Sequence, residues 1–172
     1  GDVVPGPGAD RGMVFQNYTL FPWLSVAKNI AFGLSLKGMP KAEQKQKVAH
    51  YLDIVGLSDY ANAYPKELSG GMKQRVAIAR ALANDPEVLL MDEPFGALDS
   101  QTKEQLQEFF HDLWEKTHIT VFMITHDVEE AIFLSQRVHI MDKQGKLRDT
   151  TEIALPERRE LDMKLTPEFL EY

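Results

Sequence analysis

The sequence has 172 residues, and its hydrophobic fraction of 44% and charged fraction of 26% are typical of a globular protein, not of a disordered or fibrous one. Asp and Glu outnumber Lys and Arg by 26 to 19, and the net charge of -7 argues against a large nucleic-acid surface, which needs clustered Lys and Arg. The sequence contains no cysteine, which excludes a disulfide framework, and its longest apolar runs are far shorter than a membrane span.

The first half of the sequence predicts one strand followed by helices. Residues 12–16 form an apolar run after a turn-rich segment and predict a strand. Ser25 is placed to cap a helix, and residues 40–56 predict an amphipathic surface helix that begins near a proline and ends at a glycine. A third helix is expected after the glycine pair at 70–71.

From residue 87 onward, strand and helix patterns alternate. The predicted strands are 87–92, 119–125, 137–142 and 147–153. The first two are continuous apolar runs, typical of strands buried on both faces of a parallel sheet, and residues 100–118 between them predict a helix with one apolar stripe. This alternation indicates an α/β sheet covered by helices.

The pattern divides the chain into three parts. Residues 1–32 and 85–153 are expected to form an α/β core, with the helical stretch 33–84 inserted beside it. Residues 154–172 are a charged, proline-containing tail whose function the residues do not reveal.

Two adjacent carboxylates, Asp92 and Glu93, follow the strand at 87–92. Ligands of open α/β sheets bind at the ends of strands. Asp92 is suited to a magnesium ion, directly or through water, and Glu93 to polarising a water for attack on a phosphoryl group. The alternative is a helix cap or a solvated loop, because acidic pairs after strands are common.

Ser69, Gly70 and Gly71 stand at the predicted start of a helix. Unpaired N–H groups and the helix dipole favour an anion there, and glycines let the backbone come close to it. The alternative, and the more frequent meaning of such a tripeptide, is a glycine-rich turn with Ser69 as an ordinary N-cap.

Two polar residues at predicted strand ends, and one apolar loop, each allow two interpretations. His126 can hydrogen-bond a γ-phosphate and position a water, although a lone histidine is more often structural. Gln16 can reach a metal or water, or cap the loop. Residues 19–26 either enter the core or form an exposed patch that docks a partner. Four other histidines show no metal-ligand spacing and are expected to be surface or packing residues: His50, His111, His118 and His139.

In this order, the segments resemble the ATP-binding subunit of an ABC transporter. The matching segments are Gln16 (Q-loop), LSGGMKQR at 68–75 (signature), VLLMDEP at 88–94 (Walker B), GALD at 96–99 (D-loop) and THD at 125–127 (switch histidine). Residues 6–34 are further similar to the importers of nitrate, sulfonate and taurine. The resemblance implies an incomplete P-loop NTPase (RecA-like) layered sheet with an inserted α-helical signature subdomain.

The resemblance also implies cofactors and roles. ATP and Mg²⁺ are the implied cofactors, with Asp92 and Gln16 at the metal, Glu93 as general base and His126 as γ-phosphate sensor. The implied ATP contacts are Gln16, Ser69, Gly70, Gly71 and Asp99. Met72 stands where the family often has glutamine, so no nucleotide contact is assigned to it.

The partners implied by the resemblance are protein subunits. In the family, each ATP lies between the phosphate loop of one nucleotide-binding subunit and the signature of a second, and we expect such a dimer here. Permease subunits are expected to contact the loop from Tyr18 to Leu24, which places the protein peripherally on the cytoplasmic face of the membrane. No nucleic-acid partner is expected.

One family motif is absent from the sequence. The phosphate-loop (Walker A) pattern GxxxxGK[ST] does not occur, and the single Gly-Lys pair, Gly145-Lys146, is followed by Leu147. In the family this loop precedes the Q-loop strand, and here only eleven residues precede residue 12. Because the chain also opens with Gly1 and has no leader, we expect a fragment of an importer ATPase, inactive alone and with uncovered sheet edges.

The alternative is a non-catalytic truncated module that only docks to a partner. A soluble ABC ATPase of repair or translation is disfavoured, because neither a second cassette nor a long coiled-coil insertion occurs.

Overall fold

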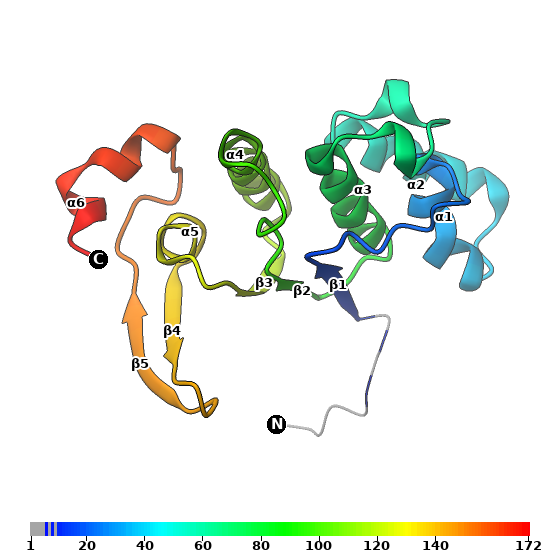
Figure 1. The fold of residues 1–172 in the computed structure, drawn as a ribbon. Helices are drawn as coiled ribbons and strands as arrows, with labels where there is room; N and C mark the ends of the chain where they lie inside the picture. Colours follow the sequence, from blue (N-terminus) through cyan, green and yellow to red (C-terminus); the bar gives the residue numbers. More distant parts are fainter. Residues whose placement is uncertain (1–5, 7, 9) are drawn as a thin grey trace.

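A computed structural model describes residues 6, 8 and 10–172. Most of the turn-rich segment at 3–11 lies outside these residues. In Figure 1, helices lie on one side of three short strands, and a separate hairpin leads to the C-terminal tail.

The three short strands form a parallel sheet in the order β1 (Arg11–Phe15), β2 (Val88–Asp92), β3 (Thr120–Ile124). These are the first three predicted strands. Phe15, Asp92 and Ile124 are aligned in the last row of the sheet, so the three carboxyl ends meet at one edge. Any side chain that directly follows these strands is therefore placed at a common edge.

The helices predicted in the first half are present as α1 (Val26–Leu36), α2 (Lys41–Ile54) and α3 (Gly70–Leu82). Two 3-10 turns, η1 (Ser58–Tyr60) and η2 (Pro65–Glu67), connect α2 to α3. Ser25 caps α1 as predicted, because its Oγ accepts a hydrogen bond from the Lys28 amide at 3.4 Å. Buried residues from the three helices share one hydrophobic cluster. The boundary expected between residues 32 and 33 falls inside α1.

One face of the sheet is covered by α3 and α4 (Ser100–Thr117). Val14, Leu89 and Met91 point to this face and are buried against Ile78 of α3 and Phe110 of α4. Burial of such apolar side chains contributes about 1.5–3 kcal/mol each to folding. This cluster holds the sheet edge in place relative to the helices.

The opposite face of the sheet is open among the described residues. Phe122 and Ile124 are 53% and 55% exposed, and Met13 and Phe15, on the same face of β1, are exposed as well. The expectation that these strands are buried on both faces is therefore wrong for this chain. Side chains alternate along a strand, and the described helices that follow the strands pack on one face only.

The fourth predicted strand does not join the parallel sheet. After α5 (Val128–Leu134), β4 (Arg137–Met141) pairs with β5 (Leu147–Glu152) in a separate antiparallel ladder. A tight turn joins them, with Gly145 at φ +75°, a conformation that favours glycine. The expectation of one continuous sheet is corrected, because β4 pairs with its neighbour in sequence.

The C-terminal tail is ordered against the rest of the chain. It contains η3 (Leu161–Leu165) and α6 (Pro167–Leu170). Phe169 of α6 is buried in a third hydrophobic cluster with Ile132, Phe133 and Ile153. Across the described part of the chain, no helix combines the length and apolarity needed to cross a membrane.

Candidate functional site

The carboxyl edge of the sheet brings Glu93 and His126 together. Glu93 directly follows β2, and His126 comes two residues after β3, the neighbouring strand. His126 Nδ1 lies 3.1 Å from Glu93 Oε1, an ion-pair distance when the imidazole is protonated. The pair is open to solvent, since the His126 side chain is 76% exposed. Two residues that the sequence proposed separately thus form one unit.

The backbone at Glu93 is held in a conformation that non-glycine residues rarely adopt. Its φ is +43°, and its amide donates a hydrogen bond to the Ile124 carbonyl at 2.9 Å. A residue held in such a conformation raises the free energy of the folded state by about 1–3 kcal/mol, and residues of this kind cluster at functional sites. The bond to β3 fixes the direction in which the Glu93 side chain leaves the strand.

Gln16 lies at the same edge, next to Gly96. A Cβ atom added to Gly96 would stand 2.8 Å from Gln16 Nε2 and 3.4 Å from Glu93 Oε2. The space beside Gly96 is therefore shared by the Gln16 amide and the Glu93 carboxylate. Sequence reasoning assigned no separate role to Gly96, although a glycine three residues after the acidic pair was the available signal.

Asp92, the last residue of β2, carries an exposed carboxylate. Its register partners are Phe15 and Ile124, so its side chain points to the open face of the sheet. Within the described ranges, this carboxylate has no hydrogen-bond or ion-pair partner. Carboxylate and amide oxygens are ligands that magnesium accepts, so Asp92 and Gln16 fit this ion chemically.

Ser69, Gly70 and Gly71 begin α3, as predicted. The Ser69 Oγ accepts a hydrogen bond from the Met72 amide at 3.3 Å, so the N-cap interpretation holds for this serine. A Cβ at Gly70 would meet Leu98 and Tyr18 at 3.0 Å, and one at Gly71 would meet Thr102 at 2.8 Å. The two glycines thus let other segments of this chain pack closely against the start of α3. The side chains nearest to the glycines belong to Tyr18, Leu98 and Thr102, not to Glu93 or His126.

Asp99 is the N-cap of α4. Its Oδ1 accepts a hydrogen bond from the Thr102 amide at 3.0 Å. Hydrogen bonds from Thr102 stabilise the ionised form of the Asp99 carboxyl and lower its pKa below the usual value. Asp99 therefore fixes the start of α4.

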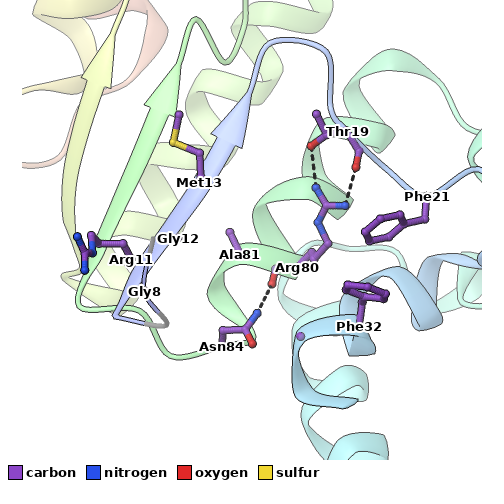
Figure 2. A pocket seen from close by; sticks show the side chains of 11 residues that line it. Gly8, Arg11, Gly12, Met13, Thr19, Phe21, Phe32, Arg80, Ala81 and Asn84 are labelled. Carbon is purple, nitrogen blue, oxygen red and sulfur yellow. Dashed lines mark hydrogen bonds between the residues drawn. The ribbon is translucent and has the colours of Figure 1, made fainter. Parts of the chain in front are cut away.

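The loop after Gln16 is tied to α3 by Arg80, which sequence reasoning missed. Tyr18 and Thr19 both have positive φ, at 57° and 47°. Arg80 donates hydrogen bonds to the Thr19 carbonyl at 2.7 Å and to Thr19 Oγ1 at 2.9 Å (Figure 2). It also donates one to the Tyr18 carbonyl at 3.3 Å. Burial lowers the pKa of the Arg80 guanidinium. The group stays charged, because the ordinary pKa of arginine lies far above neutral pH. An arginine on an otherwise apolar part of α3 was the available signal.

The apolar loop at 19–26 lies partly in and partly out of the core. Asn29 is buried, and its Nδ2 donates to the carbonyls of Phe21, Leu24 and Ser25, while its Oδ1 accepts from the Phe21 amide at 2.8 Å. Trp23 is left exposed. Beside the loop is a cavity of about 460 Å³, whose lining includes Thr19, Phe21, Phe32, Arg80 and Asn84 (Figure 2).

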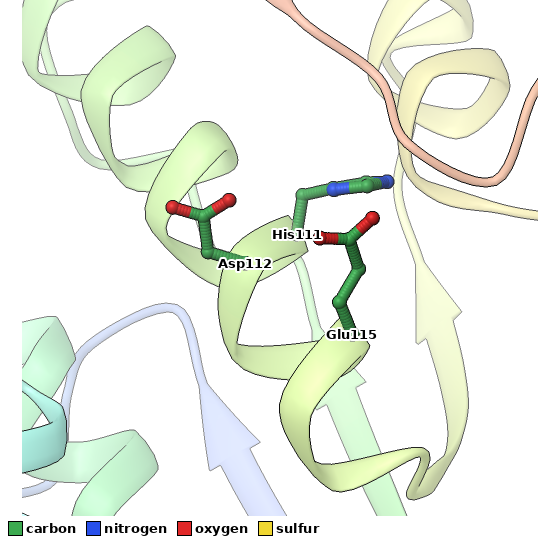
Figure 3. A group of neighbouring side chains, drawn as sticks. All are labelled: His111, Asp112 and Glu115. Atoms are coloured by element: carbon green, nitrogen blue, oxygen red, sulfur yellow. The ribbon is translucent and has the colours of Figure 1, made fainter.

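His111 departs from the expectation that the other histidines show no metal-ligand arrangement. Ligand atoms of His111, Asp112 and Glu115 on α4 lie within 4.8 Å of one another (Figure 3). The His111 ring is buried beside Phe133, at 6.2 Å between ring centroids, while Asp112 is exposed. Its predicted packing role is therefore confirmed, and the two acidic groups do not by themselves make a metal site.

Comparison with known proteins first defines the class. A dimeric ATP-binding cassette in a post-hydrolysis state, bound to ADP and phosphate, superposes with a TM-score of 0.70 at 36% identity, over 84% of this chain and 63% of that one. CbiO1 from Clostridium perfringens, part of an ABC transporter complex, gives a TM-score of 0.76 at 29% identity, over 84% of this chain and 57% of that one. The fold is that of the P-loop NTPases, as the sequence predicted.

The family follows from the sequence comparisons. The family model described as ABC transporter matches residues 4–96. A nitrate import ATP-binding protein of Synechocystis is 53% identical over the whole of this chain and 67% of its own length. A taurine import ATP-binding protein of Rhizobium johnstonii is 55% identical over 82% of this chain and 54% of its own length. The chain belongs to the ABC transporter family, and it spans between 54% and 67% of these two relatives.

Proposed function

We propose that this chain is part of the ATP-hydrolysing subunit of an ABC importer for a small solute of the nitrate, sulfonate or taurine kind. The observation that carries the proposal is the contact of 3.1 Å between Glu93 and His126 at the carboxyl ends of adjacent parallel strands. This edge is where open α/β sheets bind their ligands. The relatives named for nitrate and taurine import support the class of solute.

Glu93 is the general base of the proposed reaction. Its carboxylate accepts the proton of the attacking water, a role worth roughly 100- to 10,000-fold in rate. His126 faces Glu93 through Nδ1, which leaves Nε2 as the ring nitrogen for a phosphate oxygen. When bound, ATP supplies the phosphoryl group and magnesium the positive charge that balances it. The strained backbone at Glu93 keeps the base aimed at one place.

Asp92 and Gln16 are the proposed magnesium residues. Asp92 offers an exposed carboxylate without a partner among the described residues, and Gln16 offers an amide oxygen at the same edge. Magnesium keeps most of its waters and takes only one or two carboxylates, so this small donor set is sufficient.

Ser69, Gly70 and Gly71 are proposed to bind ATP held by a second nucleotide-binding subunit, with Asp99 beside that ATP. The turn they form packs on Tyr18 and Leu98 rather than on Glu93, which supports a role apart from the Glu93–His126 pair. The similar cassette bound to ADP and phosphate is itself a dimer. Because the 172 residues contain no GxxxxGK[ST] pattern, we expect them to bind ATP weakly on their own.

The loop from Tyr18 to Leu24 is the proposed docking surface for the transmembrane permease. Exposed Trp23 and the adjacent cavity give this loop an apolar surface with a shape that a partner can enter. Asn29 and Arg80 hold it rigidly, which lowers the entropic cost of docking. The protein is accordingly placed peripherally at the cytoplasmic face of the membrane.

The direct test is Glu93→Gln in the full-length protein. We expect hydrolysis to fall at least 100-fold while ATP binding, measured by calorimetry, is retained. Glu87→Gln is the matched control, since this exposed residue directly precedes the first residue of β2, at the other end of the strand from Glu93. Normal turnover in Glu93→Gln would remove Glu93 from the role of general base. Micromolar affinity for ATP in the 172-residue chain would contradict the expected weakness of the chain alone.

A further inference from the structure

The C-terminal tail caps helix α5. Arg159 of the tail is 4% exposed. Its Nη1 donates hydrogen bonds to the carbonyls of Ile132 at 2.8 Å, Phe133 at 3.1 Å and Ser135 at 2.8 Å. Carbonyls at the end of a helix have no partner within the helix, so Arg159 satisfies groups that would otherwise lack one. The tail thereby fixes the C-terminal end of α5.

A second tail residue, Lys164, joins α5 to α4. Its Nζ donates to Gln107 Oε1 of α4 at 3.0 Å and pairs with Glu129 Oε1 of α5 at 2.7 Å. The same ammonium lies 4.9 Å from the centre of the Phe133 ring. The Lys164 side chain is largely buried by these contacts. Three segments that are distant in sequence therefore meet at one charged group.

The two helices are also joined directly by a buried carboxylate. Glu130 of α5 is 2% exposed and accepts a hydrogen bond from Gln107 Nε2 at 3.2 Å. Lys103 of α4 lies 3.0 Å from the same carboxylate and 2.5 Å from Asp127. A buried carboxylate that loses its partner is strongly destabilising. Any movement of α5 that separates Glu130 from Lys103 and Gln107 is therefore unfavourable, and α5 has one favoured position on α4.

Helix α5 begins at Val128, two residues after His126. Asp127 is its N-cap and accepts a hydrogen bond from the Glu130 amide at 3.0 Å. The His126 ring itself is mostly exposed, so the backbone at the start of α5, rather than packing around the ring, sets its position at Glu93. We propose that Lys164 and Arg159 are positioning residues that hold α5 on α4 and thereby keep His126 at Glu93. Their effect on hydrolysis rests on the proposed function.

The test is Lys164→Met in the full-length protein, because methionine retains an apolar stem and removes both polar contacts. We expect kcat for ATP hydrolysis to fall about 10-fold with KM for ATP unchanged, since a misplaced catalytic group slows chemistry without weakening binding. Amide hydrogen exchange at residues 126–131 is expected to become faster. Lys143→Met, an exposed lysine in the turn between β4 and β5, is the control and should change neither quantity.

A double variant separates positioning from general stability. In the His126→Ala background, Lys164→Met should add no further loss of kcat. Lys164→Arg alone, which keeps the positive charge, should retain most of the hydrolysis rate. Equal losses in both backgrounds, or unchanged exchange at residues 126–131, would overturn the proposal. If Lys164→Met does not fold, Lys164→Gln replaces it. Glutamine keeps a polar N–H group but loses the charge, so a smaller effect in the same direction is expected. If the unmodified protein hydrolyses no ATP, the proposed function fails, and hydrogen exchange alone decides the positioning role.

Discussion

The two faces of the three-stranded sheet are similarly apolar but have opposite surroundings. Leu89 and Met91 are buried beneath α3 and α4, whereas Phe122 and Ile124 on the other face are exposed to solvent. Parallel sheets are normally covered on both faces. The comparison shows that the composition of a strand fixes whether it can be buried, while the connections between strands decide which face is covered.

The largest expected difference between the two faces is in unfolding free energy, when leucine is replaced by alanine at each of two neighbouring positions of β2. Leu89→Ala should cost about 2–5 kcal/mol of unfolding free energy, because it opens a cavity in the covered core. Leu90→Ala, on the open face, should cost about 1 kcal/mol or less. Urea unfolding of the 172-residue chain measures both. Equal losses would mean that the open face is covered in solution.

The covered side also depends on a polar link between α4 and α5, where a smaller effect is expected. Burial, the largest single influence, raises the pKa of Asp127. The hydrogen bonds from Lys103 and from the Glu130 amide, together with the charges of Lys103 and Lys164, outweigh it, so the pKa of this carboxyl in the folded chain lies below its usual value. A lowered folded pKa adds stability that is present above the unfolded value of about 3.9 and is lost as pH falls through the folded value.

Asp127→Asn should therefore lose about 0.5–1 kcal/mol at pH 7 and almost nothing near pH 2, because asparagine still caps the helix. Unfolding measured from pH 7 to pH 2 tests this expectation. Asp53→Asn, an exposed position on α2, is the control and should show no such convergence. A loss that persists at pH 2 would assign the effect to the cap rather than to the charge.

The open face is expected to affect association more than stability. Phe122→Ser should change the unfolding free energy by about 1 kcal/mol or less, yet reduce self-association of the 172-residue chain, since contiguous exposed apolar side chains favour association. Light scattering across a concentration series measures the association. Leu36→Ser, at the exposed end of α1, serves as the control. Unchanged scattering in Phe122→Ser would show that the open face does not drive association.

The sequence predicted the secondary structure well wherever its signals were local. Ser25 and Ser69 cap helices at the predicted positions, because a cap depends on hydrogen bonds within a few residues. The pairing of β4 was not predictable in the same way. An apolar run indicates a strand but does not specify its partner, and the short turn at Gly145 favoured β5.

The candidate site was predictable as a set of residues but not as a geometry. Glu93 and His126 follow strands, and the sequence named both, while their separation of 3.1 Å depends on β2 and β3 being neighbours in register. Arg80 was missed because its contacts are with residues far away in sequence, and Gly96 because its role depends on the approach of Gln16, which is also far away in sequence. The roles assigned to the site residues stay proposals until the variants are measured.

The sequence by itself determined the family, the order of the motifs and the helices and strands, because these depend on residue identity and on neighbours along the chain. Only the tertiary structure decided which face of the sheet is covered and that Arg159 and Lys164 of the tail hold α5. These outcomes depend on which distant segments come into contact. That choice is made by packing and by the pairing of buried charges, neither of which a residue's local sequence specifies.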